Sequence, residues 1–171
     1  MNKKQLNTNE LLVLNQLFSA GTHLGHKTSK WNSKMAPYLF GTRNGIHIID
    51  LEKTIYFLRR IVKIINCLLK DGGTIFIVGN SDDNNNFVRL LGEKFEVPYV
   101  CEKWIGGILS NWDGFSQKMQ NGKVRRRVVS FTKGLRFMNN KPSIAIVLNV
   151  NENQDAIKEI QKLNIPIVGV V

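Results

Sequence analysis

Short apolar runs that alternate with helical patterns constrain the fold of this chain more than any other feature. The runs at 74–78 and 144–148 are continuous, as in strands that are buried on both faces of a sheet. Each run is followed by turn residues and then by apolar residues spaced three and four apart, which predicts a helix. A strand, a crossover helix and a second strand, repeated along a chain, predict a parallel sheet with helices on both faces.

The individual elements follow from the same periodicity and from the turn residues that bound them. Helices are expected at 11–18, 55–69, 84–91 and 156–163. Strands are expected at 46–49, 74–78, 98–101, 144–148 and 165–171. Gly21 and Gly72-Gly73 should end the first two helices, and Ser81 or Asp82 could cap the third, whose apolar residues are Phe87, Leu90 and Leu91. The predicted fold is α/β, a single domain over 1–171 with a Rossmann-like or flavodoxin-like sheet.

The net charge of the chain indicates a polyanionic partner. The 171 residues include 24 Lys and Arg but only 13 Asp and Glu, a formal charge of +11. Between Gly21 and Ile49 there is no acidic residue at all. Cationic side chains attract phosphate, and aromatic faces can stack on bases. The RNA-binding candidates of this segment are His23, His26, Lys27, Lys30, Trp31, Lys34, Arg43 and Asn44.

Two further segments supply RNA-binding candidates. Around the paired glycines Gly106-Gly107, Lys103 and Asn111 suit phosphate and sugar contacts, whereas Trp104 is expected mainly to pack. The run 118–136 is strongly basic and contains no acidic residue. A run of charged residues is usually a solvated face. A high density of positive charge without acidic neighbours, however, favours binding to phosphate. The candidates of this run are Lys123, Arg125, Arg126, Arg127, Lys133 and Arg136, with Arg59 and Lys63 as secondary candidates on the helix 55–69.

No pattern in the chain predicts catalysis, a cofactor or a metal. Gly79 follows a strand, but it stands alone where a dinucleotide fingerprint needs three glycines, so a tight turn is the simpler interpretation. The histidines lack the paired spacing of a zinc site, and contact with phosphate or ribose competes evenly with packing as their role. Cys67 and Cys101 are expected to be small buried residues without a disulfide. No apolar run reaches the roughly 18 residues of a membrane span, and the N-terminus has neither a secretory nor a transit pattern.

Three blocks of the chain resemble one known family, in the order that the family has them. They are GTHLGHKTSKWN with KMAPYLFGTRNGIHIIDLEKT, then WIGGILSNW at 104–112, then the segment 142–166 with Asn149, Glu159 and Asn164-Ile165-Pro166. Together they resemble small ribosomal subunit protein two. The resemblance implies a structural constituent of the small subunit, without an active site or cofactor, that binds ribosomal RNA and neighbouring ribosomal proteins. The alternative is a basic, nucleotide-dependent enzyme acting on RNA, for which Asp82-Asp83 would be the only candidate carboxylate pair. A receptor role, known for eukaryotic relatives, goes with an acidic tail that is absent here.

The chain also departs from the family pattern. The family's coiled-coil arm should be reduced to a short basic insertion at about 113–141, and Ser33 stands where the family usually has proline. The strand that ends at Val171 is followed in the family by a loop and a helix. A separate polypeptide or neighbouring ribosomal proteins are therefore expected to cover this edge, and the free protein should aggregate. The abundance of Asn, Lys and Ile, which A+T-rich codons favour, suggests a mitochondrial, organelle-encoded protein. A plastid or a bacterial cytoplasm is the alternative.

Overall fold

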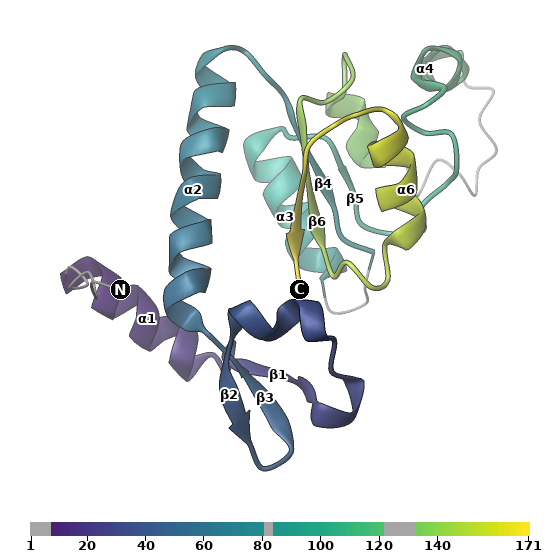
Figure 1. The fold of residues 1–171 in the computed structure, drawn as a ribbon. Helices are drawn as coiled ribbons and strands as arrows, with labels where there is room; N and C mark the ends of the chain where they lie inside the picture. The colour runs from purple at the N-terminus through teal and green to yellow at the C-terminus, as the bar shows by residue number, and fades with distance from the viewer. Residues whose placement is uncertain (1–7, 81–83, 122–132) are drawn as a thin grey trace. The chain divides into compact units, whose positions relative to one another are not determined.

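The computed structural model describes residues 8–80, 84–121 and 133–171, and the chain forms two compact units (Figure 1). The N-terminal unit ends at Ile64 and the C-terminal unit begins at Ile65. The boundary falls within helix α2, Leu51–Lys70.

The N-terminal unit contains a helix and a small antiparallel sheet. Its elements are α1 (Thr8–Ser19), β1 (Leu24–Lys27), the 3-10 helices η1 (Thr28–Lys30) and η2 (Ser33–Tyr38), β2 (Leu39–Arg43), β3 (Ile46–Ile49) and the first part of α2. The strand order is β1-β3-β2. The strand predicted at 46–49 therefore exists, but it pairs antiparallel with two strands that were not predicted, and it lies outside the parallel sheet.

A two-residue turn fixes the β2–β3 hairpin. Asn44 and Gly45 both have positive φ, 51° and 73°. A type I′ turn needs this conformation at both central residues, and Asn-Gly is its preferred sequence. The Asn-Gly pair, with a strand-like run on each side, was the signal that could have predicted the hairpin.

Turn and cap residues bound the two helices of this unit, and an ion pair joins the helices. α1 ends before Gly21, which has φ 74°, as predicted. Asp50 caps α2, because its Oδ1 accepts hydrogen bonds from the backbone N–H groups of Glu52 (3.1 Å) and Lys53 (3.4 Å). Arg59 of α2 forms an ion pair with Glu10 of α1. That pair supplies Arg59, a secondary RNA candidate, with a carboxylate from within the chain.

The C-terminal unit contains the parallel sheet. Its elements after α2 are β4 (Ile75–Val78), α3 (Asn85–Phe95), β5 (Tyr99–Val100), α4 (Trp112–Gln120), the 3-10 helix η3 (Lys133–Phe137), β6 (Ile144–Leu148), α6 (Gln154–Lys162) and β7 (Ile167–Val170). The strand order is β5-β4-β6-β7, and every pairing is parallel. This confirms the predicted α/β class.

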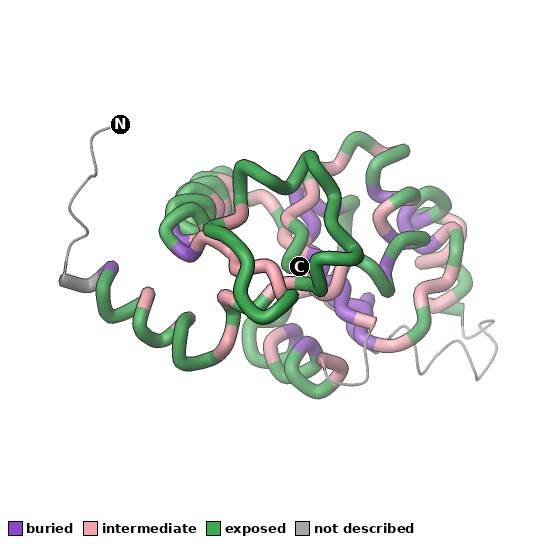
Figure 2. Tube along the Cα trace, turned by 60° about the horizontal axis from the view of Figure 1, so that its bottom comes forward, coloured by how far each residue is buried: buried purple, intermediate pink, exposed green. Residues whose placement is uncertain are grey.

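Helices cover both faces of the parallel sheet. On one face, Phe76 of β4 and Val147 of β6 belong to a fully buried cluster with Ala156 and Ile160 of α6. On the other face, Val88 of α3 packs in a second cluster with buried residues at the end of β5. Figure 1 shows α3 and α6 on opposite sides of the strands, and the buried segments of Figure 2 lie mainly along this sheet and its helices.

The helix α3 presents a different face to the sheet from the one predicted. Phe87 and Leu90 are 54% and 69% exposed, whereas Val88 and Gly92 are buried. The sheet side of α3 has no room for larger residues, because a Cβ on Gly92 would lie 2.0 Å from the ring of Tyr99. The asparagines at 84–86 open this helix as predicted, and the proposed caps Ser81 and Asp82 lie outside the described residues.

Gly79, at the end of β4, is needed for packing. A Cβ at this position would lie 2.5 Å from Cγ2 of Val88 on α3. Its φ is not in the left-handed region, and the predicted tight turn would include residues 81–83, which lie outside the described residues. The glycine lets the strand end approach the helix closely.

Candidate nucleic-acid interface

The candidates of the acid-free segment all lie in the N-terminal unit. His23 lies just before β1, and His26 and Lys27 lie within it. Lys30 ends η1, and Lys34 lies in η2. Trp31 lies between the two, and Arg43 and Asn44 lie at the end of β2 and in the hairpin turn. All except His23, which is half-buried, are exposed.

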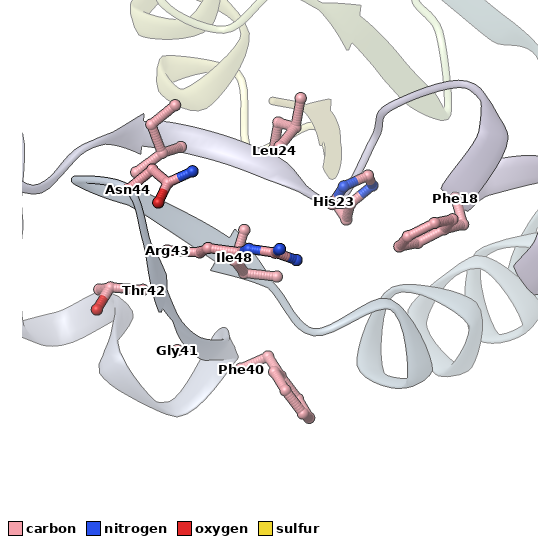
Figure 3. Close-up of a pocket in the computed structure, with 10 residues that line it drawn as sticks. Phe18, His23, Leu24, Phe40, Gly41, Thr42, Arg43, Asn44 and Ile48 are labelled. Atoms are coloured by element: carbon pink, nitrogen blue, oxygen red, sulfur yellow. The ribbon is translucent and has the colours of Figure 1, made fainter.

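Three of these candidates line one pocket of about 530 Å³ on the antiparallel sheet. His23, Arg43 and Asn44 surround it together with apolar residues that include Phe18 and Phe40 (Figure 3). In this view, Arg43 extends across the middle of the pocket, and the rings of Phe18 and His23 close one end. The pocket therefore combines a cation and an amide with apolar walls.

The histidines differ in their surroundings. The ring of His23 stacks on Phe18 with 4.3 Å between centroids and 13° between planes. His47 packs near Trp31, at 6.4 Å between ring centroids. Nδ1 of His23 and both ring nitrogens of His47 are buried without a hydrogen-bond partner in the described part of the chain. These contacts favour packing for His23 and His47, whereas His26 is exposed.

A single carboxylate organises the tryptophan block of the C-terminal unit. Oε2 of Glu159 accepts hydrogen bonds from Nε1 of Trp104 (3.1 Å) and from the backbone N–H of Gly107 (3.0 Å). Its Oε1 accepts from the backbone N–H groups of Leu109 (3.0 Å) and Ser110 (2.9 Å) and from the Ser110 hydroxyl (3.0 Å). Burial disfavours the charged form, but the hydrogen bonds from Ser110, Gly107 and Leu109 outweigh it and lower the pKa of Glu159.

Glu159 was not predicted to have this role, although the sequence contained a signal. It lies three residues after Ala156 and four before Leu163, so it falls on the apolar face of α6. A lone carboxylate on a face that packs against the core needs donors. The block of residues that supplies those donors begins 55 positions away.

The two RNA candidates of this block flank the loop that Glu159 holds. Lys103 and Asn111 are both exposed, and the Asn111 side chain makes no capping hydrogen bond at the start of α4. Trp104 is half-buried, with its ring 6.1 Å from that of Phe76 in the core. This agrees with the packing role predicted for Trp104.

The basic run 118–136 is described only in part. Lys133 and Arg136 are exposed residues of η3. Arg136 has an acidic neighbour outside the run, since its Nη2 lies 3.5 Å from Oε1 of Glu93, and its guanidinium lies 4.7 Å from the ring centre of Phe137. Lys123, Arg125, Arg126 and Arg127 lie outside the described residues.

The residues that the structure describes add neither a metal site nor a membrane span. Within 8–80, 84–121 and 133–171, no three His, Cys, Asp or Glu side chains are grouped to hold a metal ion. The helices of these residues include none that is long and apolar enough to span a membrane. Cys101 is buried as predicted, but Cys67 is exposed, because α2 turns Ile61, Ile65 and Leu68 to its less exposed side.

Comparison with known proteins identifies the family. The family model of Ribosomal protein S2 matches residues 17–130 and 113–171. The small ribosomal subunit protein uS2 of Rhodospirillum centenum is 34% identical over 93% of this chain and 70% of its own length. The proteins of the same name from Gluconobacter oxydans and Cereibacter sphaeroides are 32% and 34% identical, over 93% and 92% of this chain and 69% and 72% of their own lengths. The chain belongs to the ribosomal protein S2 family.

Proposed function

We infer that this protein is a structural constituent of the small ribosomal subunit and that it works by binding ribosomal RNA and neighbouring ribosomal proteins. Family membership supports this role and makes the protein a non-enzymatic component. No comparison supports the alternative of a nucleotide-dependent enzyme.

The observation that carries RNA binding is the acid-free basic segment on the N-terminal unit. Lys27, Lys30, Lys34 and Arg43 are exposed there, and no carboxylate occurs between Gly21 and Ile49. Folding therefore leaves these cations without an anionic neighbour from their own segment. Ribosomal RNA supplies that counter-charge through its phosphates.

A second set of contacts is proposed for the C-terminal unit. Lys103, Asn111, Lys133 and Arg136 are its described members, and Lys123 and Arg125 to Arg127 are its members in the basic run. We assign 113–141 to a short basic insertion in place of the family's arm. The two matches to the family model overlap at 113–130, so a continuous alignment is interrupted in this part of the chain.

The compartment that we propose is the mitochondrion, with the protein as part of the mitochondrial ribosome. The support is compositional, namely the abundance of Asn, Lys and Ile. A plastid or a bacterial cytoplasm is the alternative, and the relatives compared above are bacterial. We further propose that a separate polypeptide or a neighbouring ribosomal protein covers the outer edge of β7.

Sedimentation tests the function directly. The protein is tagged at its N-terminus, and lysates of purified organelles and of the remaining cytoplasm are run on sucrose gradients in magnesium. Co-migration with the small subunit at moderate salt is expected, in the organelle sample. A protein that stays at the top of the gradient above intact ribosomes would refute the ribosomal role, and co-migration from the other sample alone would refute the mitochondrial location.

A further inference from the structure

We propose that the pocket on the antiparallel sheet binds a single unstacked base of the small-subunit RNA, with Arg43 at the phosphate of that nucleotide. The pocket is the space of about 530 Å³ lined by Phe18, His23, Phe40, Arg43 and Asn44 over the sheet. This inference rests on the proposed function and assigns one site within it.

The floor of the pocket is built to stay open. Gly41 is paired with Ile48, and Arg43 with Ile46, so these four residues share one face of the hairpin. A Cβ on Gly41 would meet nothing within 4 Å. The glycine thus leaves open space opposite Ile48, on the face of the hairpin that lines the pocket.

The walls of the pocket offer flat apolar surfaces. Phe40 of β2 is 82% exposed and lines the pocket. At the other side, Phe18 and His23 form a stacked pair of rings. An unstacked base binds to proteins by stacking on aromatic rings of this kind. The volume falls within the range of about 300–1,000 Å³ that is typical of small-molecule sites.

The polar groups favour a nucleotide over an apolar protein side chain. Arg43 and Asn44 bring a guanidinium and an amide to the same pocket (Figure 3). An apolar side chain would bury both groups without hydrogen-bond partners, which is unfavourable. The edge of a base and its phosphate would instead form hydrogen bonds with the amide and the guanidinium. The acid-free segment around the pocket also carries positive charge that attracts the phosphate.

Substitution of Gly41 tests the site without removing charge or aromatic surface. Gly41→Val should place a β-branched side chain in this open space, and a strand accommodates valine well. The full-length variant is rebound to small subunits that high salt has stripped of this protein, at several salt concentrations. Accessible bases of the subunit RNA are then mapped with a base-specific chemical probe.

The expected result is a loss of affinity with an unchanged salt slope. Gly41→Val should weaken rebinding by about 5- to 150-fold, the effect of losing one stacked base. One RNA base that wild type protects should become reactive. Arg43→Gln should instead reduce the salt slope by about 0.7–0.9, because one phosphate contact is lost. Phe95→Ala, which removes an exposed aromatic ring on α3 outside the pocket, should leave both quantities unchanged.

The outcomes separate the site from the function. If wild type rebinds and Gly41→Val matches it in affinity and base protection, the pocket proposal is overturned and the ribosomal role stands. A loss of affinity without any newly reactive base would assign the pocket to a protein neighbour and also overturn it. If wild type itself fails to rebind, the proposed function fails. Circular dichroism checks the fold of Gly41→Val, and should it be misfolded, an unchanged salt slope for Arg43→Gln would overturn the proposal.

Discussion

At the scale of single residues, Glu159 is the side chain on which most of the tryptophan block depends. Its two oxygens accept five hydrogen bonds from Trp104, Gly107, Leu109 and Ser110. These donors come from the loop that carries the RNA candidates Lys103 and Asn111 at its ends. A carboxylate can accept on both oxygens at once, and an amide cannot.

Glu159→Gln should therefore destabilise the protein although it keeps the shape of the side chain. The amide nitrogen must face donors on one side, so two or three hydrogen bonds are lost. The free energy of unfolding should fall by about 1–3 kcal/mol, measured by urea denaturation. Glu152→Gln, in the exposed turn before α6, is the matched control and should change it little. Equal stability of the two variants would show that the hydrogen bonds of Glu159 contribute nothing.

The same carboxylate predicts how stability depends on pH. The pKa of Glu159 in the folded state is lowered, so its contribution is fully present above the unfolded pKa of about 4.3. That contribution should be lost as the pH falls from this value through the lower folded pKa. Wild type should thus lose its stability advantage over Glu159→Gln on acidification, in denaturation curves recorded between about pH 6 and pH 3. A difference that is constant over this range would contradict the assignment.

At the scale of elements, glycines decide how closely α3, β5 and η3 approach one another. The Tyr99 ring of β5 lies against Gly92 of α3, and its carbonyl oxygen lies against Gly134 of η3. A Cβ on Gly134 would lie 2.3 Å from that backbone oxygen, which cannot move without shifting the strand. These contacts bring η3, with Lys133 and Arg136, onto the sheet.

Gly134→Ala should therefore be destabilising, by about 1–3 kcal/mol, because the added methyl group overpacks the contact. The melting temperature and the urea midpoint measure the change. Gly106→Ala is the control, since a Cβ there would meet nothing within 4 Å. If both variants melt like wild type, η3 does not pack on β5 as described.

The outer edge of β7 carries a second prediction at this scale. In the part of the chain that the structure describes, β7 pairs only with β6, and Val170 is 50% exposed. An apolar strand with one free edge promotes pairing between molecules. Val170→Lys should lower the concentration-dependent light scattering of the free protein. Asn86→Lys adds the same charge at an exposed position of α3, which packs on β4 and β5, and should leave the scattering unchanged. Equal scattering of the two variants would exclude the edge as the cause.

At the scale of the whole molecule, the feature that relates most directly to the proposed function is the net positive charge of the chain. A formal charge of +11 is carried in part by exposed lysines and arginines of both units. Such a protein binds a polyanion through many individually weak phosphate contacts, each of which releases counter-ions. Affinity should therefore fall steeply with salt.

Arg125, Arg126 and Arg127 should account for a measurable part of this salt dependence. Replacing Arg125, Arg126 and Arg127 together with glutamine should weaken binding to stripped small subunits and reduce the salt slope by up to about three. Lys158→Gln is the control, because its ammonium lies 3.8 Å from Asp155 of its own helix. An unchanged slope in the triple variant would remove this cluster from the RNA interface.

Periodicity and turn residues were enough to predict most elements of the parallel sheet. They failed where long-range packing decides, as for the buried face of α3 and the exposure of Cys67. The antiparallel hairpin was missed although Asn44-Gly45 indicated it. Of the predicted RNA-binding residues, the structure brings His23, Arg43 and Asn44 to one pocket. Membership of that pocket could not be predicted, because it depends on how Phe18 of α1 and His23 pack beside the hairpin.

The sequence by itself determined the α/β class, the family and the basic character of the protein. Each of these properties is encoded locally, in spacing, in short motifs and in the count of charges. The tertiary structure alone decided that Glu159 holds a loop about 50 residues away and that Gly41 opens a pocket on a second sheet. Both features depend on which distant segments of the chain come into contact. Those contacts follow from the packing of the whole folded chain and not from any local pattern.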